Sequence, residues 1–271
     1  MIRSSPTRLA AAIILLCLWA AFLPLRAEPL PEGLAIVETG TAAAETRVTA
    51  ARVNLQKFDV RVITPALHPP GAPAEAQGDP ERSPRGLLLE DYKRRYNAFA
   101  VLAGGYIASF SPPTPIGLVK SDGAVANPPY VNTPHNWLQE AFVCTDQARA
   151  TIAAFKSAAD LSAYRDCLQA GPLLLKDGKV ALPAQRTANL DALYKRISQH
   201  SFACLDRTGA LLLGVTARMD FARLLRAIAA PPFGCVDALR LYIPGLLVGD
   251  NRFGEEEYLF PNALGVIKRS N

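Results

Sequence analysis

Two cationic side chains that lie four residues apart, Arg196 and His200, are candidates for binding an anion. The arginine guanidinium is permanently charged and presents a fork of donors that fits phosphate oxygens. Histidine titrates near neutral pH, so it can donate to a phosphate oxygen or relay a proton. Each residue also has a plainer explanation, because Arg196 can cap a helix ending near Ile197 and a lone histidine before a strand is commonly structural.

An acidic side chain, Asp250, could supply the second part of such chemistry. It follows Pro244-Gly245 and Gly249, and turns at these residues could return it to the end of a strand predicted over residues 238–243. A carboxylate at that place can activate water or stabilise a developing positive charge. Most loop acids are only solvated, so an exposed acid without function is the alternative.

The stretch from Arg196 to Asp250 contains the elements that must position these side chains. Residues 201–205 and 210–215 flank an Asp-Arg-Thr-Gly segment, which predicts a β-hairpin. Residues 221–228 carry four apolar side chains at helical spacing, which predicts a helix with one apolar stripe against the hairpin. The strand over residues 238–243 then runs into a Pro-Gly turn, a usual place for a functional loop.

The residues before this stretch predict further strands and two glycine turns. The predicted strands cover residues 34–37, 47–55, 58–64 and 98–103, and a charged, solvated helix covers residues 88–96. Gly104 and Gly105 follow the fourth strand, where paired glycines let the backbone approach a ligand or another strand closely. A helix from about residue 156 is predicted to end near Gly171, where another strand begins.

The N-terminus has the layout of a secretory signal peptide over residues 1–27. Two arginines precede an uncharged apolar run over residues 9–23, Pro24 ends the run, and Ala27 is a small residue at the expected cleavage point. A membrane anchor is the alternative, but the run is shorter than the roughly 20 residues that a bilayer span needs. The sequence therefore predicts an exported protein, periplasmic or secreted, with no stable membrane span after cleavage.

Charge and length limit what the exported chain can be. The whole chain has 29 Lys and Arg against 24 Asp and Glu, and the leader contains three arginines and no acid, so 26 basic residues remain against 24. With a net charge of only +2 and no basic run with interleaved aromatics, nucleic acid is not an expected partner. Residues 28–271 are predicted to form a single domain, with a Pro/Gly-rich exposed loop over residues 65–86.

Four cysteines remain after the leader is removed, and an oxidising compartment favours two disulfides. We favour Cys144 with Cys167 and Cys204 with Cys235, because each pair brackets one local unit. Two other connectivities and four buried free thiols stay open. A zinc site is disfavoured because no CxxC pair occurs and the three histidines are scattered, so no metal ligand is assigned. The sequence leaves any cofactor unknown.

The order of these motifs resembles the phosphodiester glycosidase family. A strand ending in Gly-Gly plus an aromatic is followed by a Gly-Leu-Val strand, an Asp-Gly turn, QAGPLLLKDGK, HSFACLDRTGALLLGVT, a helix and GCVDALRL. The resemblance covers about residues 87–247. It implies an α+β fold, with a mixed or antiparallel sheet and packed helices, and hydrolysis of the bond between an anomeric carbon and a phosphodiester.

The chain departs from the family pattern at three places. Active members carry Asn-Gly-Gly where this chain has Ala103-Gly104-Gly105, an Arg near His200, and Leu-Asp-Gly-Gly where this chain has Leu241 to Gly245. Tyr242 therefore stands where the resemblance places the acid, and tyrosine replaces that group as a nucleophile only in a minority of glycosidases. Two functions stay open: a hydrolase of a sugar-1-phosphodiester in an extracellular or envelope glycan, and an inactive binding or assembly module on the same fold.

Loops at neighbouring strand ends are expected to converge on one pocket for a carbohydrate or sugar-phosphate ligand. The catalytic candidates are Asp250, His200 and Tyr242. The candidates for substrate binding are Gly104, Gly105, Tyr106, Gln169, Gly171, Arg196, Ser201 and Gly245.

Overall fold

The computed structural model describes residues 29–41, 46–65, 86–130, 141–154, 161–181, 192, 194–254 and 258–269. The predicted signal peptide and nearly all of the predicted Pro/Gly-rich loop lie outside these ranges. In the described residues the fold is built mainly from β-strands, and every strand pairing between them is antiparallel. The predicted α+β class is therefore correct only in part, since helices contribute little to the described layers.

The largest sheet has seven strands and contains the predicted hairpin. The hairpin consists of β14 (Ser201–Asp206) and β15 (Leu211–Thr216), and the Asp206 carboxylate closes its turn by accepting from the backbone N–H groups of Thr208 and Ala210 at 2.8 and 3.1 Å. In spatial order the strands are β1 (Leu34–Thr39), β2 (Val48–Val53), β15 (Leu211–Thr216), β14 (Ser201–Asp206), β16 (Cys235–Leu241), β12 (Leu173–Lys176) and β13 (Lys179–Val180).

Two five-stranded sheets complete the structure, together with a short ribbon of two strands. The second sheet runs β10 (Arg149–Ala154), β9 (Ala141–Asp146), β11 (Asp166–Ala170), β7 (Val119–Ser121) and β8 (Ala124–Asn127). The third runs β18 (Asn251–Gly254), β17 (Gly245–Val248), β4 (Ala98–Ala103), β19 (Ala263–Lys268) and β3 (Phe58–Ile63), and the ribbon pairs β5 (Ile107–Phe110) with β6 (Pro113–Pro115). One apolar cluster draws side chains from all three large sheets, so the main core lies between them.

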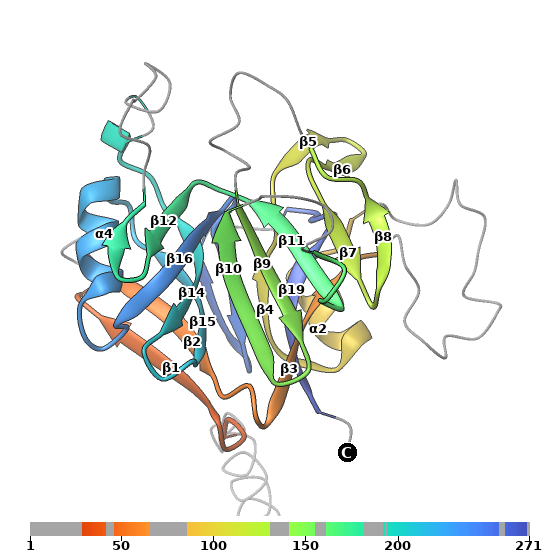
Figure 1. Cartoon of the computed structure of the whole chain (residues 1–271), viewed down its shortest axis with the longest axis horizontal. Coiled ribbons are helices and arrows are strands. Elements are labelled where there is room, and N and C mark those ends of the chain that lie inside the picture. The colour runs from red at the N-terminus through yellow and green to blue at the C-terminus, as the bar shows by residue number, and fades with distance from the viewer. Residues whose placement is uncertain are drawn as a thin grey trace, which may run out of the picture.

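Helices α4 (Phe221–Ala229) and α2 (Leu89–Tyr96) each cover the outer face of one sheet, at opposite sides of the molecule in Figure 1. Helix α4 begins where the Asp220 side chain accepts from the Arg223 N–H, and it buries the four apolar residues of its predicted stripe. Helix α2 was expected to be solvated. It buries Leu89 and Tyr92 against the third sheet, so this expectation holds only for its charged face.

The predicted helix that ends near Gly171 is wrong in its C-terminal half, which is strand β11. All five residues of β11 are buried because β9 and β7 pair with it on either side and the main core covers it. Asp166 at its start accepts from the Arg61 guanidinium at 3.0 Å and from the Val62 N–H at 3.2 Å. These long-range contacts override a weak local preference for helix. Residues 156–160 of the predicted helix lie outside the described ranges.

The predicted disulfide pairing is confirmed. Cys144 on β9 is bonded to Cys167, its direct partner on β11, and Cys204 on β14 is bonded to Cys235 at the start of β16. Two disulfides are typical of proteins from oxidising compartments outside the cytoplasm. Within the described part of the chain, no helix has the length and apolar character needed to cross a membrane.

Candidate functional site

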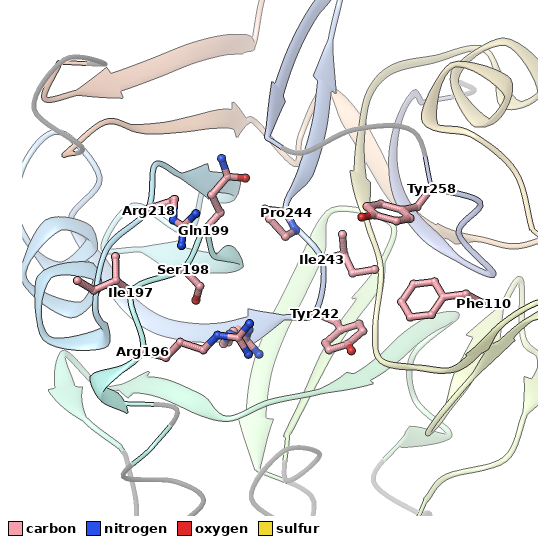
Figure 2. A pocket seen from close by; sticks show the side chains of 11 residues that line it. Phe110, Arg196, Ile197, Ser198, Gln199, Arg218, Tyr242, Ile243, Pro244 and Tyr258 are labelled. Carbon is pink, nitrogen blue, oxygen red and sulfur yellow. The ribbon is translucent and has the colours of Figure 1, made fainter.

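A cavity of about 480 Å³ opens at the ends of the central strands β14, β15 and β16 of the seven-stranded sheet, beside the loop between β16 and β17. One wall is the segment of residues 196–199 that precedes β14, and another is residues 242–244 of the β16–β17 loop. Four further side chains complete the described lining: Phe110, Arg218, Arg240 and Tyr258. Figure 2 shows that labelled arginines lie at one end of this cavity and labelled aromatic rings at the other, with Tyr242 between them.

Arg240, near the end of β16, is the most unusual residue of this lining. Only 7% of it is exposed, and Nη1 donates to the Tyr106 hydroxyl at 2.9 Å. Nε has no hydrogen-bond partner, and no carboxylate of the described residues pairs with the guanidinium. A buried cation without a counter-ion destabilises a fold, and an anion that entered this cavity could supply the missing charge.

Tyr106 lies behind Arg240. Its hydroxyl donates to the Gly171 carbonyl at 2.8 Å while accepting from Arg240, so both of its hydrogen-bonding functions are used. Burial raises the pKa of Tyr106 above its ordinary value, which keeps the phenol neutral. Its ring packs on Tyr242, with the centroids 4.6 Å apart. Three residues that the sequence proposed for the site, Tyr106, Gly171 and Tyr242, therefore lie together. Of these, only Tyr242 lines the cavity. Tyr106 and Gly171 lie behind it and position Arg240.

Two more arginines, Arg196 and Arg218, stand at the exposed part of the cavity. Neither pairs with an acid in the part of the chain that the structure describes. Because the described lining contains three guanidinium groups and no Asp or Glu, the cavity carries a positive potential that favours an anionic ligand. Arg196 lines this cavity and was a candidate from the sequence, whereas Arg218 and Arg240 were not among the sequence candidates. A charged residue inside the apolar strand VDALRLYI was the signal that could have identified Arg240.

His200 and Ser201 lie under the cavity and not in it. His200 is fully buried, its ring packs edge-on against Phe221 at 4.9 Å, and Nε2 lies 2.8 Å from the Met219 carbonyl oxygen. A carbonyl can only accept, so Nε2 carries the hydrogen. Burial, reinforced by the charge of Arg240, lowers the pKa of His200 to about 4. His200 is therefore a neutral, buried group near pH 7, and Ser201 beside it is equally inaccessible.

The burial of neutral His200 predicts that the protein becomes less stable as the pH falls. The pKa of His200 is about 4 in the folded protein and 6.5 in its unperturbed state, so the unfolded chain binds a proton first as pH falls. The free energy of unfolding should be highest above pH 6.5 and should decrease between pH 6.5 and 4, by up to about 3 kcal/mol from this residue.

Chemical denaturation of wild type and His200→Gln at pH 7 and pH 4.5 measures this contribution. The glutamine amide can still donate to the Met219 carbonyl but does not titrate, so its stability should change less between the two pH values. Identical pH dependence in the two proteins would contradict a histidine that is buried in the neutral form.

The predicted glycines and Gln169 approach protein groups and not the cavity. A Cβ atom on Gly104 would lie 1.8 Å from Oδ1 of Asn262, and one on Gly105 would lie 2.8 Å from the Gln169 carbonyl. The Gln169 side chain accepts from the backbone N–H groups of Leu118 and Tyr130 at 2.8 and 2.9 Å. The two glycines allow close backbone packing, and Gln169 joins neighbouring segments by hydrogen bonds, so all three act on the structure around the cavity. Gly245, the first residue of β17, is buried directly after the cavity-lining loop.

Asp250 is not brought to the cavity. It lies in the turn between β17 and β18, and the four residues of β17 separate it from the cavity-lining loop by roughly 13 Å. Its side chain is 73% exposed and pairs with Nζ of Lys93 at 3.2 Å. The glycine turns therefore lead the chain away from the cavity, and the structure offers Asp250 no contact with it. Within the described residues, no cluster of three or more His, Cys, Asp or Glu could hold a metal ion.

Comparisons with solved structures identify the same fold elsewhere. A hypothetical protein from Synechocystis superposes with a TM-score of 0.64 at 13% identity, over 90% of this chain and 64% of that chain. The catalytic domain of zebrafish N-acetylglucosamine-1-phosphodiester alpha-N-acetylglucosaminidase, described as auto-inhibited by its pro-peptide, superposes with a TM-score of 0.61 at 15% identity, over 90% of this chain and 85% of that chain.

At the level of sequence, no curated protein matches. The family model for phosphodiester glycosidases, however, matches residues 96–241. This range is just over half of the chain and runs from the end of α2 to the end of β16, so it includes Tyr106, Arg196 and Arg240. The chain belongs to the phosphodiester glycosidase family.

Proposed function

We propose that this exported protein binds a sugar-1-phosphodiester of an extracellular or envelope glycan in the cavity beside Arg240. The observation that carries the proposal is the buried guanidinium of Arg240, which faces the cavity without a carboxylate partner among the described residues. A phosphodiester supplies the missing negative charge, and its two non-bridging oxygens fit the parallel donors of a guanidinium.

The other two arginines suit this ligand as well. Arg196 and Arg218 are exposed, so they can attract an anion from solution before Arg240 binds it at the buried end. A solvated cation contributes less to affinity than a desolvated one, because water screens it. We therefore assign most of the affinity for the phosphodiester to Arg240, and the rate of association to Arg196 and Arg218.

Hydrolysis of the bound diester is the second candidate function, and family membership favours it. The bond between the anomeric carbon and its phosphate oxygen would break, with the electron pair staying on the phosphate, while the oxygen of water bonds to the carbon and one proton of that water passes to solvent. The arginines stabilise the departing phosphate, so this leaving group requires no proton. Tyr242 is the described side chain between the cationic and aromatic ends, where a nucleophile could face the anomeric carbon.

One experiment separates the two functions. Wild-type protein is titrated calorimetrically with the methyl diester of N-acetylglucosamine 1-phosphate, and the same mixture is assayed for free sugar over a day. We expect saturable binding with a Kd below about 1 mM. Binding without release of sugar identifies a binding module, and release that Tyr242→Phe abolishes identifies an enzyme.

One result would refute the proposal, and another would extend it. Absence of binding at millimolar diester would refute it. Hydrolysis gained by Tyr242→Asp, in a protein whose wild type binds without cleaving, would show that the cavity orients the diester correctly and lacks only the acid that the family pattern has at this place.

A further inference from the structure

The aromatic end of the cavity contains two rings that a folded protein would ordinarily bury. Phe110, the last residue of β5, is 50% exposed, and Tyr258, four residues after the end of β18, is 44% exposed. Their ring centroids lie 5.9 Å apart, although 148 positions separate them in the chain. Exposed apolar side chains that gather at a cavity commonly mark a place where a ligand binds.

The two rings are held by separate elements and face the same cavity as the arginines. Figure 2 shows Phe110 and Tyr258 on one side of Tyr242 and Ile243, with Arg196 and Arg218 on the other side. A ligand that spans the cavity must therefore be anionic at one end and must present a flat, weakly polar surface at the other. An alkyl chain or a pyranose ring could offer such a surface.

The chemistry of the rings favours the pyranose. The face of an aromatic ring carries partial negative charge and attracts the polarised C–H groups on the face of a sugar ring. Sugar hydroxyl groups project sideways from that face, so they stay in water and keep their hydrogen bonds while the rings stack. A long alkyl chain would need a deeper apolar channel, whereas these rings are half exposed and the cavity is shared with three guanidinium groups.

We propose that Phe110 and Tyr258 form the sugar subsite of the cavity and stack on the pyranose ring attached to the phosphodiester. This inference rests on the proposed function, because it assumes that Arg240 holds the phosphate. Phe110 and Tyr258 then determine selectivity for a glycosyl diester over other phosphodiesters, and Arg240 determines affinity for the phosphate. The orientation follows: the phosphate lies toward β16 and the sugar toward β5.

Three probes test the subsite by calorimetry: the methyl diester of N-acetylglucosamine 1-phosphate, dimethyl phosphate, and hexyl methyl phosphate. Wild type should bind the sugar diester more tightly than either of the others. Phe110→Ala and Tyr258→Ala should each weaken sugar-diester binding about 3- to 10-fold, and the double variant about 10- to 100-fold. Binding of dimethyl phosphate should not change, because that probe has no group to stack on the rings.

Conservative and control variants separate stacking from other effects. Tyr258→Phe keeps the ring and should bind as wild type does, whereas Phe110→Leu keeps apolar area but loses the flat face and should behave like Phe110→Ala. Tyr130→Ala removes an aromatic side chain of similar exposure that does not line the cavity, so its binding should match wild type.

The outcomes are distinguishable from those of the proposed function. If wild type binds all three diesters equally, or if hexyl methyl phosphate binds as tightly as the sugar diester, the sugar subsite is refuted while phosphodiester binding stands. If the double variant weakens dimethyl phosphate as much as the sugar diester, the rings support the fold of the cavity and do not recognise sugar. If wild type binds none of the probes, the proposed function fails and the subsite with it.

Discussion

Replacing Arg240 with methionine is expected to weaken binding of the sugar diester roughly 10- to 150-fold, which corresponds to the 1.5–3 kcal/mol of a hydrogen bond to a charged group. The same change should leave the free energy of unfolding unchanged or raise it. Wild type buries a cation that pairs with no carboxylate of the described residues, and removing such a charge is often stabilising. Tyr106 keeps its hydrogen bond to the Gly171 carbonyl in the variant, so no buried polar group is newly orphaned.

Calorimetry and thermal unfolding of the same preparations measure both effects. Arg226→Met is the matched control, because Arg226 is an exposed arginine of α4 that does not line the cavity and its loss changes the net charge equally. The pKa of His200 should also rise in Arg240→Met, since the guanidinium is one cause of its low value. A large loss of stability with unchanged binding would identify Arg240 as a structural residue.

Removing the disulfide between Cys204 and Cys235 is expected to lower the free energy of unfolding by roughly 2 to 5 kcal/mol. The bond joins β14 to the start of β16 and encloses β15 and α4 in a loop with a sequence separation of 31. Without the bond, this segment gains conformational entropy in the unfolded chain, which favours unfolding. Both sulfur atoms are buried beside α4, and alanine is preferred to serine because a serine hydroxyl would be left there without a partner.

Denaturant unfolding of both single alanine variants and the double variant tests the bond. The singles and the double should lose similar stability, because each of them breaks the same covalent bond. Cys144→Ala/Cys167→Ala serves as a comparison with a similar sequence separation of 23, and a similar cost is expected. Four reactive thiols in native, unreduced protein would show that neither bond exists in solution.

Elements whose sequence pattern and tertiary contacts agree could be predicted without the structure. The hairpin of β14 and β15 has apolar runs around a polar turn that ends in glycine, and α4 has an apolar stripe ended by two prolines. Both disulfides join residues of a single local unit, so their short sequence separations favoured the correct pairing. The order of these motifs was also sufficient to indicate the family.

Elements that depend on distant partners were predicted less well. The DCLQA sequence of β11 has no alternating pattern and does not predict a strand, because the strand depends on pairing with β9 and β7. Asp250 was expected near the end of β16, but β17 pairs with β4 and carries the acid away from the cavity.

The candidate site could be predicted only in part from the sequence. Residue types and spacing were enough to indicate the fold family and the disulfides, and they made Arg196, which lines the cavity, a candidate for anion binding. They could not show that the buried ring of His200 packs against Phe221, that Arg240 faces a cavity whose described lining contains no acid, or that the rings of Phe110 and Tyr258 lie side by side. Each of these facts is set by side chains that are far apart in the chain and meet only when three sheets pack around one core, because solvent access and charge pairing depend on neighbours in space.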